Sequence, residues 1–229
     1  MIEQVRLRDG TDAFVLPLQR TDKATLAAEY ETLAPESQRR RFLAPVMHLT
    51  DSMLERLVDD VDGIDHIALV LCAEASPDVY DPVALARVVR YTDVPDAADL
   101  AVTVKDEWQG RGVATVLLEV LMRGRPSGVD RIVTEVFNDN RASLMMLHRL
   151  GRTTVEDLGY GVSEVVVELQ PRRSQAPRSK APPGEGADHG TRKWMLAPAG
   201  VVAEVPSLLR DPAHRHALRT RDQVCPWFN

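Results

Sequence analysis

Apolar and polar residues follow two different periods along residues 3–170, one typical of strands and one typical of helices. Alternating or continuous apolar segments predict strands, and apolar residues spaced three and four apart predict amphipathic helices. The expected strands are residues 3–8, 13–18, 65–73, 83–91, 99–104, 131–137 and 162–169, and the expected helices are 21–33, 35–42, 50–58, 113–122 and 141–150. This order predicts an α+β fold around a central mixed sheet, not a regular doubly wound one.

Short polar signals set the expected boundaries of these elements. The dipeptide Asp9-Gly10 predicts a hairpin between the first two strands. Thr21 or Asp22 is suited to cap the first helix, and Thr50 or Asp51 to cap the third. Gly151 is placed to end the last helix. One or two strands are expected after that glycine.

The pattern changes abruptly after Gln170. Residues 171–193 read PRRSQAPRSKAPPGEGADHGTRK, which has no apolar periodicity. Such a composition cannot bury enough surface to offset the entropy of ordering, so a flexible linker rich in Pro and Arg is expected. Residues 194–229 regain apolar side chains but are interrupted by four prolines. We therefore expect a domain at 1–170, a linker at 171–193 and a C-terminal tail of unknown role at 194–229.

Composition and charge narrow the classes of function. The chain has 229 residues, of which 44% are hydrophobic and 27% charged, and a net charge of -6, which gives no overall attraction to nucleic acid or anionic membrane. Two cysteines are too few for a disulfide framework or a zinc site, and no other metal site is expected. No apolar segment is long enough to span a bilayer. A cytoplasmic soluble protein is the resulting expectation.

Residues 101–121 carry the clearest chemical signal. A strand ends near Val104, a turn contains Gly110 and Gly112, and an apolar helix begins at about Val113. Backbone N–H groups at a helix start attract an anion, and glycines let the backbone turn sharply and approach a phosphate. Arg111 adds a positive charge. A plain chain reversal would use the same glycines, so both interpretations stay open.

Two other phosphate-binding motifs fit these residues less well. A P-loop requires Gly-x4-Gly-Lys-Ser/Thr, which the sequence lacks. A dinucleotide fingerprint requires a third glycine where Thr115 stands, close to the first strand of the fold. Glu135 follows at about the spacing of the ribose-binding acid in that fingerprint, about 20 residues on. The dinucleotide interpretation is therefore kept as an alternative.

Residues 109–114, QGRGVA, resemble the signature Gln/Arg-x-x-Gly-x-Gly/Ala of the GNAT superfamily of N-acetyltransferases. Residues 135–143, EVFNDNRAS, look like its second conserved block, and 35–43, PESQRRRFL, are similar to a segment of bacterial protein-lysine acetyltransferases. The resemblance spans residues 3–170. It implies a GNAT fold, with a mixed and mostly antiparallel sheet flanked by helices. It also implies acetyl-CoA as cosubstrate and an amine acceptor, either a protein lysine or a small molecule.

The resemblance further implies where coenzyme A binds. The pantetheine arm is expected along the end of the signature strand, and the pyrophosphate on the amides of the turn and the helix start. Asn140 is expected to bind the pantetheine region, with Ser143 one turn on, although Asn140 also suits a helix N-cap. The implied cofactor-binding residues are Val102, Thr103, Val104, Gln109, Gly110, Arg111, Gly112, Val113, Ala114, Thr115, Asn140 and Ser143.

Two carboxylates are candidates for the general base that an amine acceptor needs. Asp99 precedes the signature, where protein-acetylating relatives carry Glu, and Glu135 matches the base of relatives that acetylate N-terminal amines. Many relatives also carry a Tyr that protonates the departing thiolate, but Leu147 occupies that position, with His148 beside it. A thiol of pKa about 8.5 leaves without much help, so the loss of that Tyr does not by itself exclude catalysis.

Three functions remain open from the sequence. The first is an acetyl-CoA-dependent N-acetyltransferase. The second is a non-catalytic protein that senses coenzyme A, which the missing Tyr and the short acid at Asp99 suggest. The third is a partner-binding adaptor that works through residues 194–229. Release of free thiol in the presence of an amine separates the first from the second.

Overall fold

The computed structural model describes residues 2–77 and 79–170. The predicted linker at 171–193 and the tail at 194–229 lie outside these residues. The described part contains a sheet of eight strands in the order β1-β2-β3-β4-β5-β6-β8-β7. The strands are β1 (Glu3–Arg6), β2 (Asp12–Pro17), β3 (His66–Ser76), β4 (Val79–Arg90), β5 (Ala97–Val104), β6 (Arg131–Phe137), β7 (Gly151–Gly159) and β8 (Val162–Leu169).

The sheet is mixed, and six of its seven strand pairs are antiparallel. Only β5 and β6 run parallel. A parallel pair needs a crossover connection, which is here the helix α4 (Val113–Gly124). The predicted α+β fold with a mostly antiparallel sheet is confirmed.

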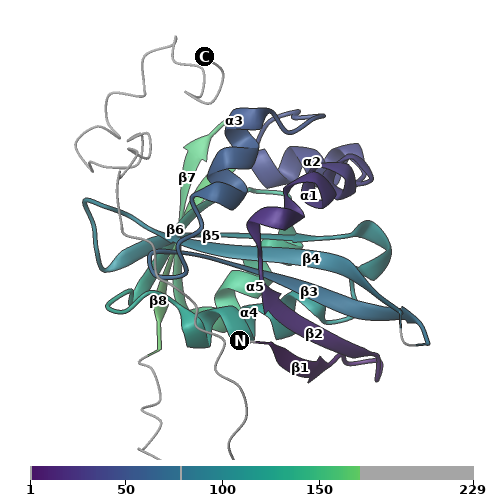
Figure 1. Cartoon of the computed structure of the whole chain (residues 1–229). Helices are drawn as coiled ribbons and strands as arrows, with labels where there is room; N and C mark the ends of the chain where they lie inside the picture. Colours follow the sequence, from purple (N-terminus) through teal and green to yellow (C-terminus); the bar gives the residue numbers. More distant parts are fainter. Residues whose placement is uncertain (1, 78, 171–229) are drawn as a thin grey trace, which may run out of the picture. The chain divides into compact units, whose positions relative to one another are not determined.

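Helices cover both faces of this sheet, as Figure 1 shows. On one face lie α1 (Lys23–Glu31), α2 (Pro35–Phe42) and α3 (Asp51–Leu54), with the wider turns of η2 (Glu55–Asp59) continuing α3. On the other face lie α4 and α5 (Arg141–Leu150). Each face has its own apolar core, the larger one beneath α4 and the smaller one beneath the three N-terminal helices. None of the helices in the described ranges is long and apolar enough to cross a bilayer.

The predicted helix caps differ in their outcome. The Thr50 hydroxyl accepts a hydrogen bond from the Met53 amide at 3.3 Å, as expected of an N-cap. Asp22 does not cap α1, because its carboxylate accepts from the Gln19 amide at 2.8 Å instead. The chain therefore forms the short turn η1 (Arg20–Asp22) first, and α1 starts two residues later than predicted.

Gly151 ends α5 as predicted, but for a different reason. Its backbone is extended, with φ of 173°, and not left-handed. A Cβ atom at this position would lie 1.9 Å from the Glu168 carbonyl oxygen of β8. Glycine is therefore needed for the close approach of β7 to β8. One or two strands were expected after Gly151, and β7 is the one found in addition to β8.

Candidate functional site

The parallel strands β5 and β6 separate soon after they begin. Their ladder contains only the pairs Ala97–Arg131 and Ala98–Ile132. Beyond these pairs the Thr134 hydroxyl still reaches the Leu100 carbonyl at 3.2 Å. The rest of β5 pairs only with β4 on its other edge, as far as Val104. A gap therefore opens between β5 and β6, and half of the backbone N–H and C=O groups of β5 face it.

The glycine turn lies at the end of β5, next to this gap. It comprises the short helical turn η3 (Asp106–Trp108) and the residues up to Val113, where α4 begins. Gly110 and Gly112 have φ of 76° and 87°, the left-handed conformation that favours glycine. A Cβ would meet no atom within 4 Å at Gly110 and only Arg8, at 3.5 Å, at Gly112, so backbone conformation and not crowding requires these glycines.

The start of α4 has the properties of an anion site. Gly112 is its N-cap and supplies no side-chain acceptor. The amides at the start of a helix have no carbonyl partner within it, and the helix dipole adds positive potential there. Here these are the amides of Val113, Ala114 and Thr115. The sequence predicted this arrangement.

Arg111, which is predicted to stand beside a phosphate, has three partners within the protein. Its guanidinium pairs with the Asp9 carboxylate at 2.6 Å, reaches the Thr11 hydroxyl at 3.2 Å and lies over the Trp108 ring at 4.0 Å. Hydrogen bonds from Thr11, with Arg111, lower the pKa of Asp9 to about 2. Arg111 thus fastens the glycine turn to the β1–β2 hairpin, and Asp9 compensates its charge.

Gln109 has a comparable holding role. Its side-chain nitrogen donates to the Val104 carbonyl at 3.3 Å and to Asp106 at 3.1 Å. Asp106 in turn accepts from the Ala34 amide at 2.8 Å and the Ser37 hydroxyl at 2.6 Å, at the start of α2. The turn is therefore held to the end of β5 and to α2. No pattern in the sequence indicated that Asp106 holds the turn in this way.

On the far side of the gap, Asn140 caps α5. Its side-chain oxygen accepts from the Ser143 amide at 3.2 Å, which confirms the cap interpretation. The side-chain nitrogen has no hydrogen bond to the described residues. Leu147, where relatives carry Tyr, is 1% exposed and packs in the core, while His148 is exposed.

Both candidate bases lie on the sheet face covered by α1–α3. Ala98, Leu100 and Ile132 belong to the core on the opposite face. Because side chains alternate along a strand, Asp99 of β5 and Glu135 of β6 point the other way. Burial raises the pKa of Glu135, and the negative charges of Glu164 and Asp99 raise it further. The structure therefore brings the two predicted carboxylates into one interacting group.

Two arginines that the sequence analysis missed share this face. Burial lowers the pKa of Arg41, on α2, to about 9, with a contribution from Arg87. Burial also lowers the pKa of Arg87, on β4, while the negative charge of Asp99 favours the charged form of both arginines. Arg87 interrupts an apolar strand, which was a usable signal. Its proximity to Arg41 comes only from the fold.

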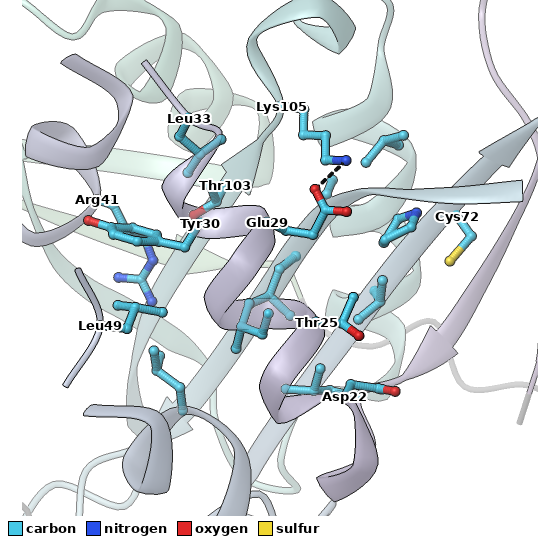
Figure 2. A pocket seen from close by; sticks show the side chains of 18 of the residues that line it. Asp22, Thr25, Glu29, Tyr30, Leu33, Arg41, Leu49, Cys72, Thr103 and Lys105 are labelled. Atoms are coloured by element: carbon cyan, nitrogen blue, oxygen red, sulfur yellow. Dashed lines mark ion pairs between the residues drawn. The ribbon is translucent and has the colours of Figure 1, made fainter. Parts of the chain in front are cut away.

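A cavity of about 210 Å³ lies between α1 and the sheet on the same face (Figure 2). Aliphatic side chains form most of its wall, and Arg41, Thr103 and Lys105 contribute polar groups. Lys105 forms an ion pair with Glu29 at 2.5 Å, drawn as the dashed line in Figure 2. Thr103 joins this cavity to the predicted pantetheine strand. The described residues contain no group of three or more His, Cys, Asp or Glu side chains suited to hold a metal ion.

Comparison with known proteins identifies relatives of this arrangement. The model of the Acetyltransferase (GNAT) family matches residues 36–151. Acetyltransferase Pat of Mycolicibacterium smegmatis is 35% identical over 166 residues, which are 71% of this chain and 48% of Pat. The chain thus spans about half the length of this curated relative.

Solved structures agree with this similarity. The GNAT domain of S. lividans PAT is 29% identical, with a TM-score of 0.64 over 73% of this chain and 97% of that domain. The yncA protein from Salmonella typhimurium, solved with its cofactor acetyl-CoA, is 19% identical, with a TM-score of 0.53 over 73% of this chain and 99% of that one. At that identity the second likeness concerns the fold alone.

Proposed function

Because the chain belongs to the GNAT family of acetyltransferases, we propose that it transfers the acetyl group of acetyl-CoA to a primary amine by direct attack. The observation that carries this proposal is the gap between β5 and β6. The amides of the glycine turn lie at one end of the gap. The carboxylates of Asp99 and Glu135 and the cavity beneath α1 lie on the sheet face covered by α1–α3. A donor and an acceptor can therefore reach the same place from opposite sides.

Acetyl-CoA occupies the gap in this proposal. The pantetheine amides pair with β5 at Val102, Thr103 and Val104, as an added strand would. The pyrophosphate accepts hydrogen bonds from the backbone amides between Gly110 and Thr115. The side-chain nitrogen of Asn140 donates a hydrogen bond to the pantetheine, and Ser143 lies beside Asn140. The yncA protein, which shares the fold, has acetyl-CoA as its cofactor.

Glu135 is the proposed general base. A lysine-like amine has a pKa of about 10.4, so it is almost fully protonated at neutral pH and must lose a proton before it attacks. A base whose pKa is raised toward neutral pH is better matched to this task, and the pKa of Glu135 is raised. Once Glu135 has taken one proton, the amine nitrogen bonds to the acetyl carbon and loses its second proton to solvent. The C–S bond breaks, and coenzyme A leaves as a thiolate that takes a proton from solvent.

A two-step experiment tests the proposal. Acetyl-CoA at a hundred times its Kd should stabilise the protein by about 2.7 kcal/mol, visible as a rise in Tm. Free thiol should then be released only when an amine is present. In that assay Glu135→Gln should lower kcat by about 10² to 10⁴ while the Tm shift persists. Glu156→Gln, an exposed change on β7, is the matched control.

The outcomes separate the possible errors. If acetyl-CoA does not raise Tm, the donor site is wrong. If Asp99→Asn removes activity while Glu135→Gln retains it, then Asp99 and not Glu135 is the base. If acetyl-CoA binds but no amine releases thiol, the chain is a coenzyme A sensor. The buried Leu147 favours that second function, because no phenol stands where relatives carry Tyr.

A further inference from the structure

Two arginines on the sheet face covered by α1–α3 have no acidic partner among the described residues. Among residues 2–77 and 79–170, neither Arg41 nor Arg87 has a carboxylate oxygen within 4.0 Å. The Nε atom of Arg87 is buried without a hydrogen bond. The Arg41 guanidinium lies 4.7 Å from the centre of the Phe42 ring. Both side chains are partly buried, and neither charge has the carboxylate partner that a buried charge normally has.

Other arginines on the same elements are paired. Arg39 and Arg40, also in α2, bond to Glu36 at 3.0 and 2.7 Å. Arg90, three residues further along β4, forms an ion pair with Asp65 at 2.9 Å, although its Nε atom, like that of Arg87, is buried without a hydrogen bond. Among the described residues of α2 and β4, Arg41 and Arg87 are thus the arginines without an ion pair.

The two charges also affect each other. The positive charge of Arg87 lowers the pKa of Arg41, so the two guanidiniums interact unfavourably. Asp99 acts on both, but from beyond ion-pair distance. An anion bound to both would relieve this repulsion. A carboxylate fits well, because each guanidinium presents a planar fork of donors that matches its two oxygens.

The register of the sheet places such an anion near the proposed base. Arg87 lies opposite Ala101 of β5. The β5–β6 register, continued past Ala98, brings Ala101 level with Glu135. Paired strands are about 4.8 Å apart and β5 and β6 have separated at this level, so the backbones at Arg87 and Glu135 are at least about 10 Å apart. The only side chain between them in this row is the methyl group of Ala101.

The cavity indicates which chemical group the bound molecule carries besides its anion. Thr103 follows Ala101 on the same face of β5 and lines the cavity, as does Arg41 (Figure 2). Its wall is mostly aliphatic, and its volume of about 210 Å³ is smaller than that of a site for a drug-sized ligand, which is about 300–1,000 Å³. An aliphatic side chain can occupy it.

We propose that the acceptor is an apolar α-amino acid, held by its carboxylate between Arg41 and Arg87 with its amine at Glu135. This rests on the proposed function and names its substrate class. A protein lysine would bring no carboxylate to the two arginines, because any acidic neighbour of that lysine would stay outside the cavity.

Thiol release from acetyl-CoA tests this with matched acceptors. The amino acids are L-leucine, L-methionine and L-valine, and each is compared with its carboxamide and its decarboxylated amine. We expect kcat/KM to be about tenfold to a hundredfold higher for the amino acid, since charge-assisted hydrogen bonds are lost in the analogues. Arg87→Gln and Arg41→Gln should each collapse the ratio between amino acid and carboxamide. Arg90→Gln should keep that ratio.

Three results would overturn the inference. The first is equal use of amino acids and carboxamides by the unchanged protein. The second is that Arg87→Gln lowers the rates of both by the same factor, which would mean a structural role. The third is that lysine-containing peptides are acetylated while no free amino acid is. In all three the thiol release itself shows that the acetyltransferase proposal stands, whereas a lack of any Tm shift with acetyl-CoA would remove the proposed function first.

Discussion

Replacing Gly151 by Ala should destabilise the protein more than any other single added methyl group at its described glycines. The new Cβ would lie 1.9 Å from the Glu168 carbonyl oxygen and 3.3 Å from the Val167 side chain. Real Cβ atoms essentially never approach another atom closer than 3.0 Å, so β7 must move away from β8 by more than 1 Å. That movement strains the pair Gly151–Leu169 at the start of the ladder.

The size of the effect follows from these contacts. Overpacking costs about 1–3 kcal/mol, and a lost ladder hydrogen bond costs about 0.5–1.5 kcal/mol. The alanine recovers about 0.4–1 kcal/mol by restricting the unfolded chain. We therefore expect a loss of about 2 kcal/mol, which lowers Tm by about 4–8 °C for a domain of this size.

Calorimetric melting of Gly151→Ala beside Gly124→Ala measures this effect. Gly124 is the last residue of α4, and a Cβ there would meet no atom within 4 Å. The control should be neutral or should stabilise by up to about 1 kcal/mol, as alanine does in helices. A Gly151→Ala protein whose Tm lies within about 2 °C of the Tm of the unchanged protein would refute the reasoning. So would an equal loss of stability in both variants.

Two further predictions concern the base and a helix cap. Glu164→Gln removes a negative charge that raises the pKa of Glu135; since the base acts when deprotonated and activity rises through its pKa, the acid limb of kcat/KM should move to lower pH. An unchanged limb in a pH–rate profile would show that Glu135 is not the titrating base. Thr50→Ala removes the acceptor for the Met53 amide and should cost about 1 kcal/mol, or about 2–4 °C in Tm. Thr50→Ser, which keeps the hydroxyl, should retain most of that stability.

The features that short segments determine could be predicted from the sequence. Gly110 and Gly112 stand in a strand–turn–helix pattern, from which a sharp turn was expected, and their backbone is left-handed there. Asn140 was correctly assigned as a cap, because capping depends on neighbours within one helical turn. The cofactor role of these residues remains a prediction.

The features that depend on distant segments were missed. Arg41 and Arg87 are far apart in the chain, and only the packing of α2 on the sheet, against β5 beside β4, brings their charges together. No pattern in the sequence indicated that Arg111 pairs with Asp9, which is 102 residues earlier. β7 gave a weak signal because most of its residues are exposed and therefore show no apolar alternation.

The glycine turn is fastened by residues that come much earlier in the chain, Asp9 and Thr11 in the hairpin and Ala34 and Ser37 in α2. Closing loops of about 70 to 100 residues is entropically costly, so such contacts form late in folding. The turn can reach its final conformation only after the first forty residues are in place. Ligand binding at the turn must then also oppose local opening of the hairpin, because the opened state lacks the ordered turn. Slower amide hydrogen exchange in β1 and β2 would accompany binding at a site that neither strand forms.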